Sequence, residues 1–322
     1  MKAPGNPANP VEERLEEAIL ASEVLTRAPA TYQVATSPVA SPIRRAVEHD
    51  CARVCVDGTE YFLSRRTEDA ADFVDVPGSA HAARQAAAAG VAPAVIEELV
   101  GVDSVVYEHL PEGVRWARND DLAEVDLLAR VVAAKKLLHE GPSMGRRRSV
   151  FGEIESFAQL AARDLPSHMV PGSTLWLRDC AAQCDAALSA SGVGLVPAHG
   201  DGVSSNVMVS DDGSRVWLVD YDVAADIDMF HDLGSLLVES CRSDDDWRTG
   251  VELALGTADE TNHARCRLYG FADDLRWGLW GVVMGHLSGR PGIEFYKYGQ
   301  WRLLRAHYTA SDRRFESWLR GV

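Results

Sequence analysis

The sequence lacks long apolar runs. No stretch approaches the roughly 20 consecutive apolar residues that are needed to span a bilayer. The first ten residues, MKAPGNPANP, also lack the apolar segment of a signal peptide. The sequence therefore predicts a cytoplasmic protein that neither crosses nor binds a membrane.

Positive charge is scarce as well. The chain has 32 Lys and Arg residues against 48 Asp and Glu residues, a formal net charge of −16. This balance argues against nucleic acid and anionic membranes as partners. It is compatible with a cationic small-molecule substrate, although solvated surface carboxylates would produce the same excess. Few of the positive charges are lysines, which stand only at positions 2, 135, 136 and 297.

The six cysteines lack the spacing of a metal site, because they form no CxxC pair. Cys180 and Cys184 are one helical turn apart, which is more typical of packed free thiols than of metal ligands. The length of 322 residues suits one two-lobed domain or two small domains. With 46% hydrophobic and 25% charged residues and no visible repeat, the chain reads as a soluble globular protein.

The most informative stretch is residues 197–239, whose polar residues follow a recognisable spacing. A His-Gly-Asp tripeptide ends at Asp201, and Asn206 follows five residues later. After a hairpin turn at Asp212-Gly213 and an apolar strand, Asp220 begins an Asp-Tyr-Asp triplet. His-x-Asp with Asn at plus five is the catalytic-loop pattern of kinase folds.

This spacing indicates metal-assisted phosphoryl transfer. In such a site one carboxylate accepts a proton from the substrate hydroxyl, while an amide and a second carboxylate hold Mg²⁺ against the nucleotide phosphates. Asp201 would be the base, and Asn206 and Asp220 would hold Mg²⁺. The alternative is a set of surface carboxylates around an ordinary hairpin. The His-x-Asp segment with its Asn and the later Asp-Tyr-Asp triplet follow one another in the order of a kinase fold, and this favours the catalytic interpretation.

The stretch resembles the choline kinase and aminoglycoside phosphotransferase superfamily. Asp220-Tyr221-Asp222 stands where that family has an Asp-aromatic-acidic triplet, and the sequence from His231 to Gly234, with Glu239, matches its following helix. The tail from Trp277 to Arg305 resembles the choline and ethanolamine kinase branch in its Trp-x-x-Trp and its late aromatics. The similarity extends from about residue 30 to about residue 310.

The resemblance implies an α+β, two-lobed, protein-kinase-like fold, with a small, mostly antiparallel sheet lobe and a larger, mostly helical lobe. The expected divisions are 1–28 for an N-terminal tail and helix, 29–110 for the nucleotide-binding lobe, and 111–322 for the catalytic and substrate-binding lobe. Periodicity and turn signals predict these elements: helix 10–27, hairpin 53–63 with its turn at Asp57-Gly58, strand 105–111, and helices 79–89, 121–139, 173–191 and 232–242.

Three features depart from the family pattern. The loop that usually covers the phosphates corresponds to Ser41–Ala46, which has no glycine, so Arg44 or Arg45 would have to supply charge there. The small lobe also has no lysine, and Arg65 is the expected replacement on the strand; a solvated strand end is the alternative. Helix 79–89 has no acidic residue, so the usual pair between helix glutamate and strand cation is either replaced or formed only after a rearrangement.

The resemblance assigns further roles. Backbone groups of Glu108, His109 and Leu110 would contact the purine of ATP or GTP, and Asp222 would assist with metal or substrate. Asp232 would hydrogen-bond the backbone of the catalytic loop, and His139 is expected to be structural. An aromatic and acidic pocket would bind an amine-bearing acceptor, although core packing would explain most of these aromatic residues equally well. The substrate-binding residues are Asp222, Glu239, Trp277, Trp280, Tyr296 and Trp301.

The sequence therefore predicts a Mg²⁺-dependent kinase that phosphorylates a hydroxyl of a small, cationic molecule. The acceptor would be an amino alcohol of the choline type, or an aminoglycoside or aminonucleoside antibiotic in a self-resistance role. The alternative is a degenerate kinase that serves as a binding or scaffold protein. That alternative rests on the missing glycine-rich loop and the missing helix glutamate.

Overall fold

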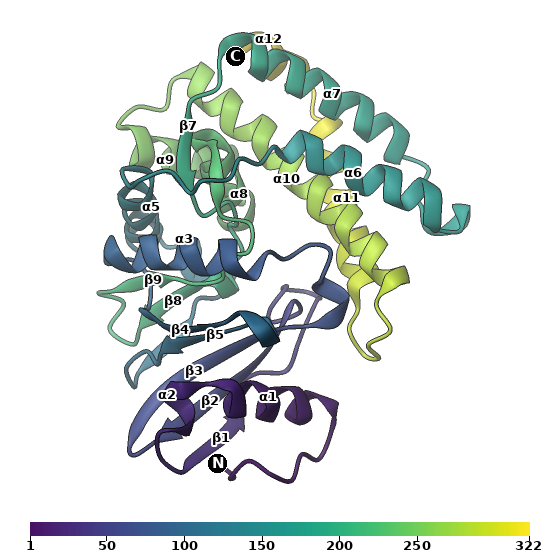
Figure 1. Cartoon of the computed structure of the whole chain (residues 1–322). Coiled ribbons are helices and arrows are strands. Elements are labelled where there is room, and N and C mark those ends of the chain that lie inside the picture. Colours follow the sequence, from purple (N-terminus) through teal and green to yellow (C-terminus); the bar gives the residue numbers. More distant parts are fainter.

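The computed structural model describes all 322 residues, which form a sheet lobe and a helical lobe (Figure 1). The sheet lobe contains five antiparallel strands in the order β1-β2-β3-β5-β4. Their bounds are β1 Ala30–Val34, β2 His49–Val56, β3 Thr59–Arg66, β4 Val95–Leu99 and β5 Ser104–Glu108. The predicted α+β class with a small antiparallel lobe is confirmed.

The β2–β3 hairpin forms where the sequence predicts it. Its two turn residues, Asp57 and Gly58, have φ values of +50° and +76°. Two central residues with positive φ match the right-handed twist of the flanking strands, which is why Asp-Gly favours this connection. The hairpin places the side chains of His49 on β2 and Ser64 on β3 on the wall of the cavity between the lobes.

The N-terminal helix is shorter than predicted. α1 (Pro10–Ala21) begins at its predicted cap, since the Asn9 side chain accepts a hydrogen bond from the Glu12 N–H. It ends where Ser22 adopts an extended backbone and caps a second short helix, α2 (Glu23–Thr26). The single helix predicted for 10–27 is therefore wrong. α3 (Val76–Ala88) is the helix predicted over 79–89, and it begins three residues earlier.

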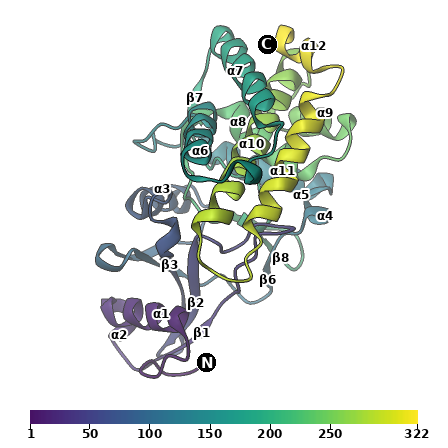
Figure 2. The same cartoon turned by 90° about the vertical axis from the view of Figure 1, so that its right-hand side faces the viewer.

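The helical lobe is organised around the 28-residue helix α10, which packs against α6, α8 and α11 (Figures 1 and 2). Helix 121–139 is broken in two at Ala123 and Glu124, whereas 173–191 and 232–242 correspond closely to α7 and α8. The remaining helices are α4 Asn119–Leu122, α5 Val125–His139, α6 Val150–Asp164, α7 Thr174–Ser191, α8 Met229–Ser240, α9 Asp244–Leu255, α10 Glu260–Leu287, α11 Phe295–Ala310 and α12 Phe315–Gly321.

Five short strands form two further sheets in this lobe. The strands β6, β8 and β9 form one sheet, in which β8 and β9 flank the predicted turn at Asp212-Gly213, and β7 pairs with β10 in the other. Their bounds are β6 Val114–Trp116, β7 Leu195–Ala198, β8 Val207–Ser210, β9 Val216–Leu218 and β10 Ala225–Asp228. The predicted catalytic loop, residues 199–206, lies between β7 and β8.

The two lobes are joined by the chain segment after β5, and they also contact each other elsewhere. In Figure 2 the connection between α10 and α11 reaches down to the sheet lobe. There Ser288 and Arg290 contact the Asp69 carboxylate at 2.5 and 2.8 Å.

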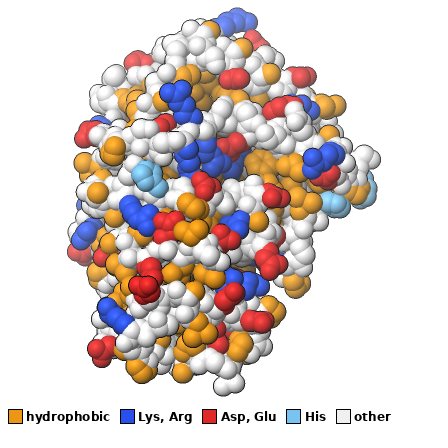
Figure 3. Space-filling view, viewed as in Figure 1, with side chains coloured by type: hydrophobic (Ala, Val, Ile, Leu, Met, Phe, Trp, Pro, Cys, Tyr) orange, Lys and Arg blue, Asp and Glu red, His pale blue; other side chains and the backbone are white.

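The face drawn in Figure 3 has acidic and basic side chains interspersed rather than gathered into a field of one sign. None of the helices has both the length and the apolar character that a membrane crossing requires. All six cysteines are free, and Cys180 and Cys184 are buried in the large core, as expected.

Candidate active site

Two glycines hold the catalytic loop close to neighbouring backbone. Gly200 has a φ of +76°, and a Cβ at this position would lie 2.9 Å from the carbonyl oxygen of Val223. A Cβ on Gly202 would overlap the carbonyl of Ser235 in α8. Both positions therefore exclude a side chain, and they fix the backbone on either side of Asp201.

Asp232 anchors this loop from α8. One carboxylate oxygen accepts hydrogen bonds from the Gly200 N–H and the Lys135 ammonium, both at 2.7 Å, and the other contacts His139 Nε2 at 2.8 Å. Lys135 also donates to the Asp201 backbone carbonyl at 3.1 Å. Burial opposes ionisation, but the Lys135 charge and the His139 hydrogen bond hold the pKa of Asp232 below its usual range. The structural roles predicted for Asp232 and His139 fit these contacts.

Replacing Asp232 with Ala should lower the free energy of unfolding by about 3–5 kcal/mol, because it leaves the buried Lys135 ammonium and the Gly200 N–H without their acceptor. Asp179→Ala is the matched control, since Asp179 is exposed on α7; its effect should stay within about 0.5 kcal/mol. Urea unfolding of both variants measures the difference. Coincident midpoints would show that Asp232 does not anchor the loop.

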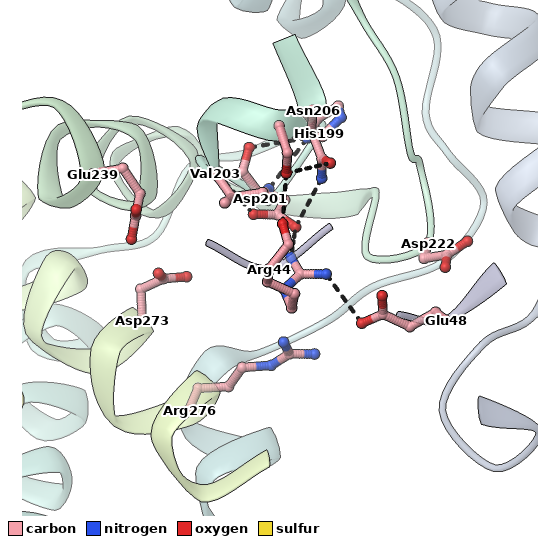
Figure 4. Close-up of polar contacts among 12 residues, drawn as sticks. Arg44, Glu48, His199, Asp201, Val203, Asn206, Asp222, Glu239, Asp273 and Arg276 are labelled. Carbon is pink, nitrogen blue, oxygen red and sulfur yellow. Dashed lines mark hydrogen bonds and ion pairs between the residues drawn. The ribbon is translucent and has the colours of Figure 1, made fainter. Parts of the chain in front are cut away.

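The Asp201 carboxylate is buried and fully bonded. One oxygen accepts a hydrogen bond from the Val203 N–H and the other from the Asn206 amide, each at 3.1 Å. The second oxygen also forms an ion pair with the guanidinium of Arg44 (Figure 4). Burial acts to raise the pKa of Asp201, but the Arg44 charge outweighs it and lowers the pKa to about 2. Asp201 is therefore ionised, as a proton acceptor must be.

Asp220 is the carboxylate without a partner. It lines the cavity between the lobes together with Asn206, and it makes no hydrogen bond or ion pair within the protein. Burial and the neighbouring charges of Asp222 and Glu48 raise its pKa well above the usual range. A φ of +69° turns the backbone sharply at this residue. A partly buried carboxylate that lies near other carboxylates is a position that a cation would stabilise.

Asp222 is already paired. One of its oxygens contacts His49 Nε2 at 2.7 Å and the other accepts a hydrogen bond from the Ser79 hydroxyl at 3.0 Å. Burial acts to lower the pKa of His49, but the Asp222 charge and hydrogen bond raise it to about 9. The ligand atoms of His49, Asp220 and Asp222 all lie within 4.8 Å of one another. Three metal-binding groups thus converge on the predicted metal position, and His49 was not predicted among them.

The donor set fits Mg²⁺. Carboxylate and amide oxygens are the ligands that this hard cation takes, usually with water and substrate phosphates completing the shell. Asp220 supplies a free carboxylate and Asn206 an amide oxygen on the same cavity wall. Asp222 would add a second carboxylate once His49 no longer shares its charge. These residues would therefore hold the metal.

The cavity between the lobes has a volume of about 620 Å³, within the range of small-molecule sites. Glu108, His109 and Leu110, the predicted purine contacts, all line it. Apolar side chains from both lobes, including Val105 and Met208, contribute to the same walls. The cavity can hold a nucleotide with its base at the chain crossing and its phosphates toward Asp220, although the purine contacts themselves stay a prediction.

The structure does not support the phosphate contact predicted for Arg65. Its guanidinium points away from the cavity, toward α1, where it donates to the Arg14 carbonyl and pairs with Glu17 at 2.7 Å. Side chains alternate between the faces of a strand, so the neighbouring Ser64 faces the cavity instead. The cavity-lining cations near this wall are Arg45, His49 and Arg53, and Arg53 pairs with Glu60. On α3 the Ser79 hydroxyl bonds Asp222, and this helix contributes no acidic side chain to the cavity.

Of the four predicted aromatic residues, Trp277 makes the closest contact with the charged groups around Asp201, and the Trp280 ring centroid lies farther away, 5.8 Å from Arg44 Cζ. Trp277 receives a guanidinium on each face, with Arg44 Cζ 3.7 Å and Arg276 Cζ 3.6 Å from the ring centroid. Trp280 packs behind it in the core, at 5.2 Å between ring centroids. The hydroxyl of Tyr296 donates to the Met169 carbonyl at 3.0 Å, and the side chain of Trp301 is 51% exposed.

The predicted acidic contribution from Glu239 is also used internally. Its carboxylate pairs with Arg302 and, at 3.2 Å, with Arg305. Arg302 pairs in turn with Asp273 at 2.5 Å and Asp274 at 2.6 Å. Glu239 therefore belongs to an ion-pair network between α8, α10 and α11. The role of Glu239 in substrate binding, like those of Tyr296 and Trp301, has no support in these contacts.

Sequence reasoning missed the position of Arg44. It was considered as a phosphate contact, yet its side chain lies against Asp201 and Trp277 (Figure 4). Arg45, the next residue, lines the nucleotide-sized cavity, with its guanidinium carbon 4.4 Å from the Trp116 ring centroid. The only sequence signal was the pair of arginines in a loop where the family usually has glycine.

Comparisons with known proteins bear on the family and the fold. A model of the phosphotransferase enzyme family matches residues 41–269, while a search among curated proteins gave no match. Among solved structures, a choline/ethanolamine kinase family protein from Mesorhizobium loti has a TM-score of 0.78 at 21% identity, covering 96% of this chain and 98% of that one. The choline kinase LicA from Streptococcus pneumoniae has a TM-score of 0.75 at 16% identity, covering 94% and 99%.

A more distant structure is spectinomycin phosphotransferase in complex with ADP and spectinomycin. Its TM-score is 0.51 at 13% identity, with 87% of this chain and 93% of that one covered. At such identities these three similarities show a shared fold. They place the two-lobed architecture among choline kinases and antibiotic phosphotransferases.

Proposed function

We propose that this chain, which belongs to the phosphotransferase enzyme family, is a small-molecule kinase. It transfers the γ-phosphate of ATP or GTP to a hydroxyl group of a cationic acceptor. The observation that carries this proposal is the position of Asp201 between two sites. Its carboxylate bonds Asn206, which lines the nucleotide-sized cavity, and Arg44, which lies on Trp277.

Each residue then has a defined task. Asp201 accepts the proton of the acceptor hydroxyl, and the Val203 N–H and the Asn206 amide hold its carboxylate in place. Asn206 and Asp220 hold Mg²⁺, with Asp222 as an additional ligand. When bound, Mg²⁺ neutralises charge on the transferring phosphates. Arg45 and His49 on the cavity wall supply the positive charge toward the phosphates that Arg65 does not.

The acceptor is proposed to be cationic because the pocket beside Asp201 already stabilises a cation. The Trp277 ring and the carboxylates of Asp201 and Glu48 surround the Arg44 guanidinium. An ammonium or guanidinium group on an aromatic face is stabilised by up to about 2 kcal/mol when it is desolvated. An amino alcohol suits this compact pocket, and an amino sugar or aminonucleoside antibiotic presents the same two chemical groups.

A second candidate is a degenerate kinase that binds ligands without turnover. It is favoured by Arg44, which occupies the carboxylate of Asp201, and by the neutral serines at positions 64 and 79. Mg²⁺-dependent nucleotide consumption, measured with a panel of amino alcohols, aminoglycosides and aminonucleosides, separates the two. Acceptor-stimulated consumption supports the kinase. Nucleotide binding without consumption across the panel supports the second candidate.

Trp277→Leu should reduce the preference for a cationic acceptor over its neutral analogue, in which hydroxyl replaces the amine. Loss of the aromatic face removes up to about 2 kcal/mol of selective binding, so the ratio of the two kcat/KM values should fall by up to about thirtyfold. Trp176→Leu is the matched control, because Trp176 is exposed on α7. An unchanged ratio in Trp277→Leu, or equal use of both acceptors by the unmodified enzyme, would contradict the cationic pocket.

A further inference from the structure

The β1–β2 connection, residues 35–48, is seated on the helical lobe rather than held above the cavity. Ala40 and Val47 belong to the main hydrophobic core of that lobe. The backbone carbonyl of Arg44 accepts a hydrogen bond from the Ser205 hydroxyl at 2.6 Å, and that of Val47 accepts one from Arg290. Side-chain packing and backbone hydrogen bonds therefore both hold this loop against the catalytic loop and the α10–α11 connection.

This loop places the side chain of Arg44 next to Asp201, the proposed catalytic base. Its guanidinium pairs with Asp201, pairs with Glu48 at 3.0 Å, and covers one face of Trp277. Figure 4 shows Arg44 lying between Asp201 and Arg276, with Glu48 to one side. The side chain is only 4% exposed. No other cation bonds the Asp201 carboxylate, so this contact neutralises it.

We propose that Arg44 is an internal occupant of the acceptor site and that the acceptor binds only when residues 35–48 withdraw it. This inference rests on the proposed function, in which Asp201 receives the acceptor hydroxyl. The same carboxylate oxygen and the same ring face cannot serve Arg44 and the acceptor together. Arg44 and the acceptor therefore compete for one site, and the structure shows the site in its internally occupied form.

This competition makes Arg44 a specificity-determining residue. Its withdrawal removes the positive charge from Asp201 and Glu48, two buried carboxylates, and uncovers the Trp277 face. An acceptor with its own cation restores that charge, whereas a neutral acceptor leaves buried carboxylates without a partner. Only a compound that carries a positive charge close to its hydroxyl replaces Arg44 without loss.

The neighbouring arginine provides a matched comparison. Arg45 is next in the same loop, yet it lines the nucleotide cavity beside Trp116. Replacing Arg45 with Ala removes an arginine from the same loop but leaves Arg44 in contact with Asp201. Any effect on cation binding that is specific to Arg44 therefore comes from the site and not from the loss of loop charge.

Methylguanidinium binding tests the proposal without nucleotide or turnover. We expect Arg44→Ala to bind it at least tenfold more tightly than the unmodified protein, measured by Trp fluorescence at constant ionic strength with NaCl as the reference salt. Arg45→Ala should match the unmodified protein, and adding Trp277→Leu to Arg44→Ala should abolish the gain. Equal binding by the unmodified protein, Arg44→Ala and Arg45→Ala would overturn the proposal.

A second variant covers the case in which Arg44→Ala fails to fold. Ser205→Ala removes the hydrogen bond that holds the Arg44 backbone carbonyl but leaves Asp201, Glu48 and Trp277 intact, so it should raise methylguanidinium affinity about threefold; no change would overturn the proposal. In active enzyme, Arg44→Ala should lower the acceptor KM and spare the nucleotide KM. A hundredfold fall in kcat with unchanged acceptor KM would instead make Arg44 part of the transfer machinery. Absence of turnover in the unmodified protein would refute the kinase and leave the binding result standing.

Discussion

Asp201→Asn is expected to lower kcat by about 10²–10⁴-fold and to leave nucleotide affinity nearly unchanged. The amide keeps the shape of the carboxylate, but it cannot accept the proton of the acceptor hydroxyl. Asp201 does not line the nucleotide cavity; it reaches that cavity only through its hydrogen bond with Asn206. Binding of the nucleotide should therefore survive the change.

The measurement is a pair of assays on the purified variant: steady-state turnover with the best acceptor, and calorimetric titration with nucleotide and Mg²⁺. Retention of more than about a tenth of the activity would remove Asp201 from its assigned role. A parallel loss of nucleotide affinity would instead indicate that the catalytic loop had been displaced.

Asp220→Ala is expected to abolish turnover and the part of nucleotide affinity that depends on Mg²⁺. Asp220 is the carboxylate of the site that makes no ion pair within the protein, and neutral Asn206 cannot replace its charge. Removing the metal from the unmodified protein with EDTA should produce the same loss.

Asp222→Ala is the matched comparison for Asp220→Ala. Because Asp222 is paired with His49 and Ser79, its loss should weaken the Mg²⁺ dependence less than the loss of Asp220 does. Titrating nucleotide binding against Mg²⁺ in both variants measures the order of the two effects. A Mg²⁺ dependence that is unaltered in Asp220→Ala would contradict the metal assignment.

The sequence predicted best those parts that depend on local signals. The Asp57-Gly58 hairpin and the spacing from Asp201 to Asn206 require only neighbouring residues, and the expected elements form there. The phosphate contact predicted for Arg65 was wrong because side chains alternate along a strand, so a register error of one residue moves a side chain to the other face of the sheet. Ser22 broke the first helix by capping α2, which the apolar periodicity of 10–27 does not reveal.

The aromatic tail shows a different limit. α10 is buried on almost every side along much of its length, so periodicity cannot tell which of its side chains face a pocket. Trp277 and Trp280 were indistinguishable for that reason. The contact between Arg44 and Asp201 spans 157 residues of sequence. No spacing rule connects two such positions, and only the folded chain brings them together.

The central claim is that this chain transfers a phosphate to a hydroxyl of a small cationic molecule. Phosphorus NMR of reactions that contain Mg²⁺, ATP or GTP and one acceptor tests it most directly, because it separates a new phosphomonoester from inorganic phosphate. We expect a phosphomonoester with a cationic acceptor, much less with its neutral analogue, and none with Asp201→Asn. A protein that binds nucleotide and Mg²⁺ yet forms no phosphomonoester with any amino alcohol, aminoglycoside or aminonucleoside would contradict the account.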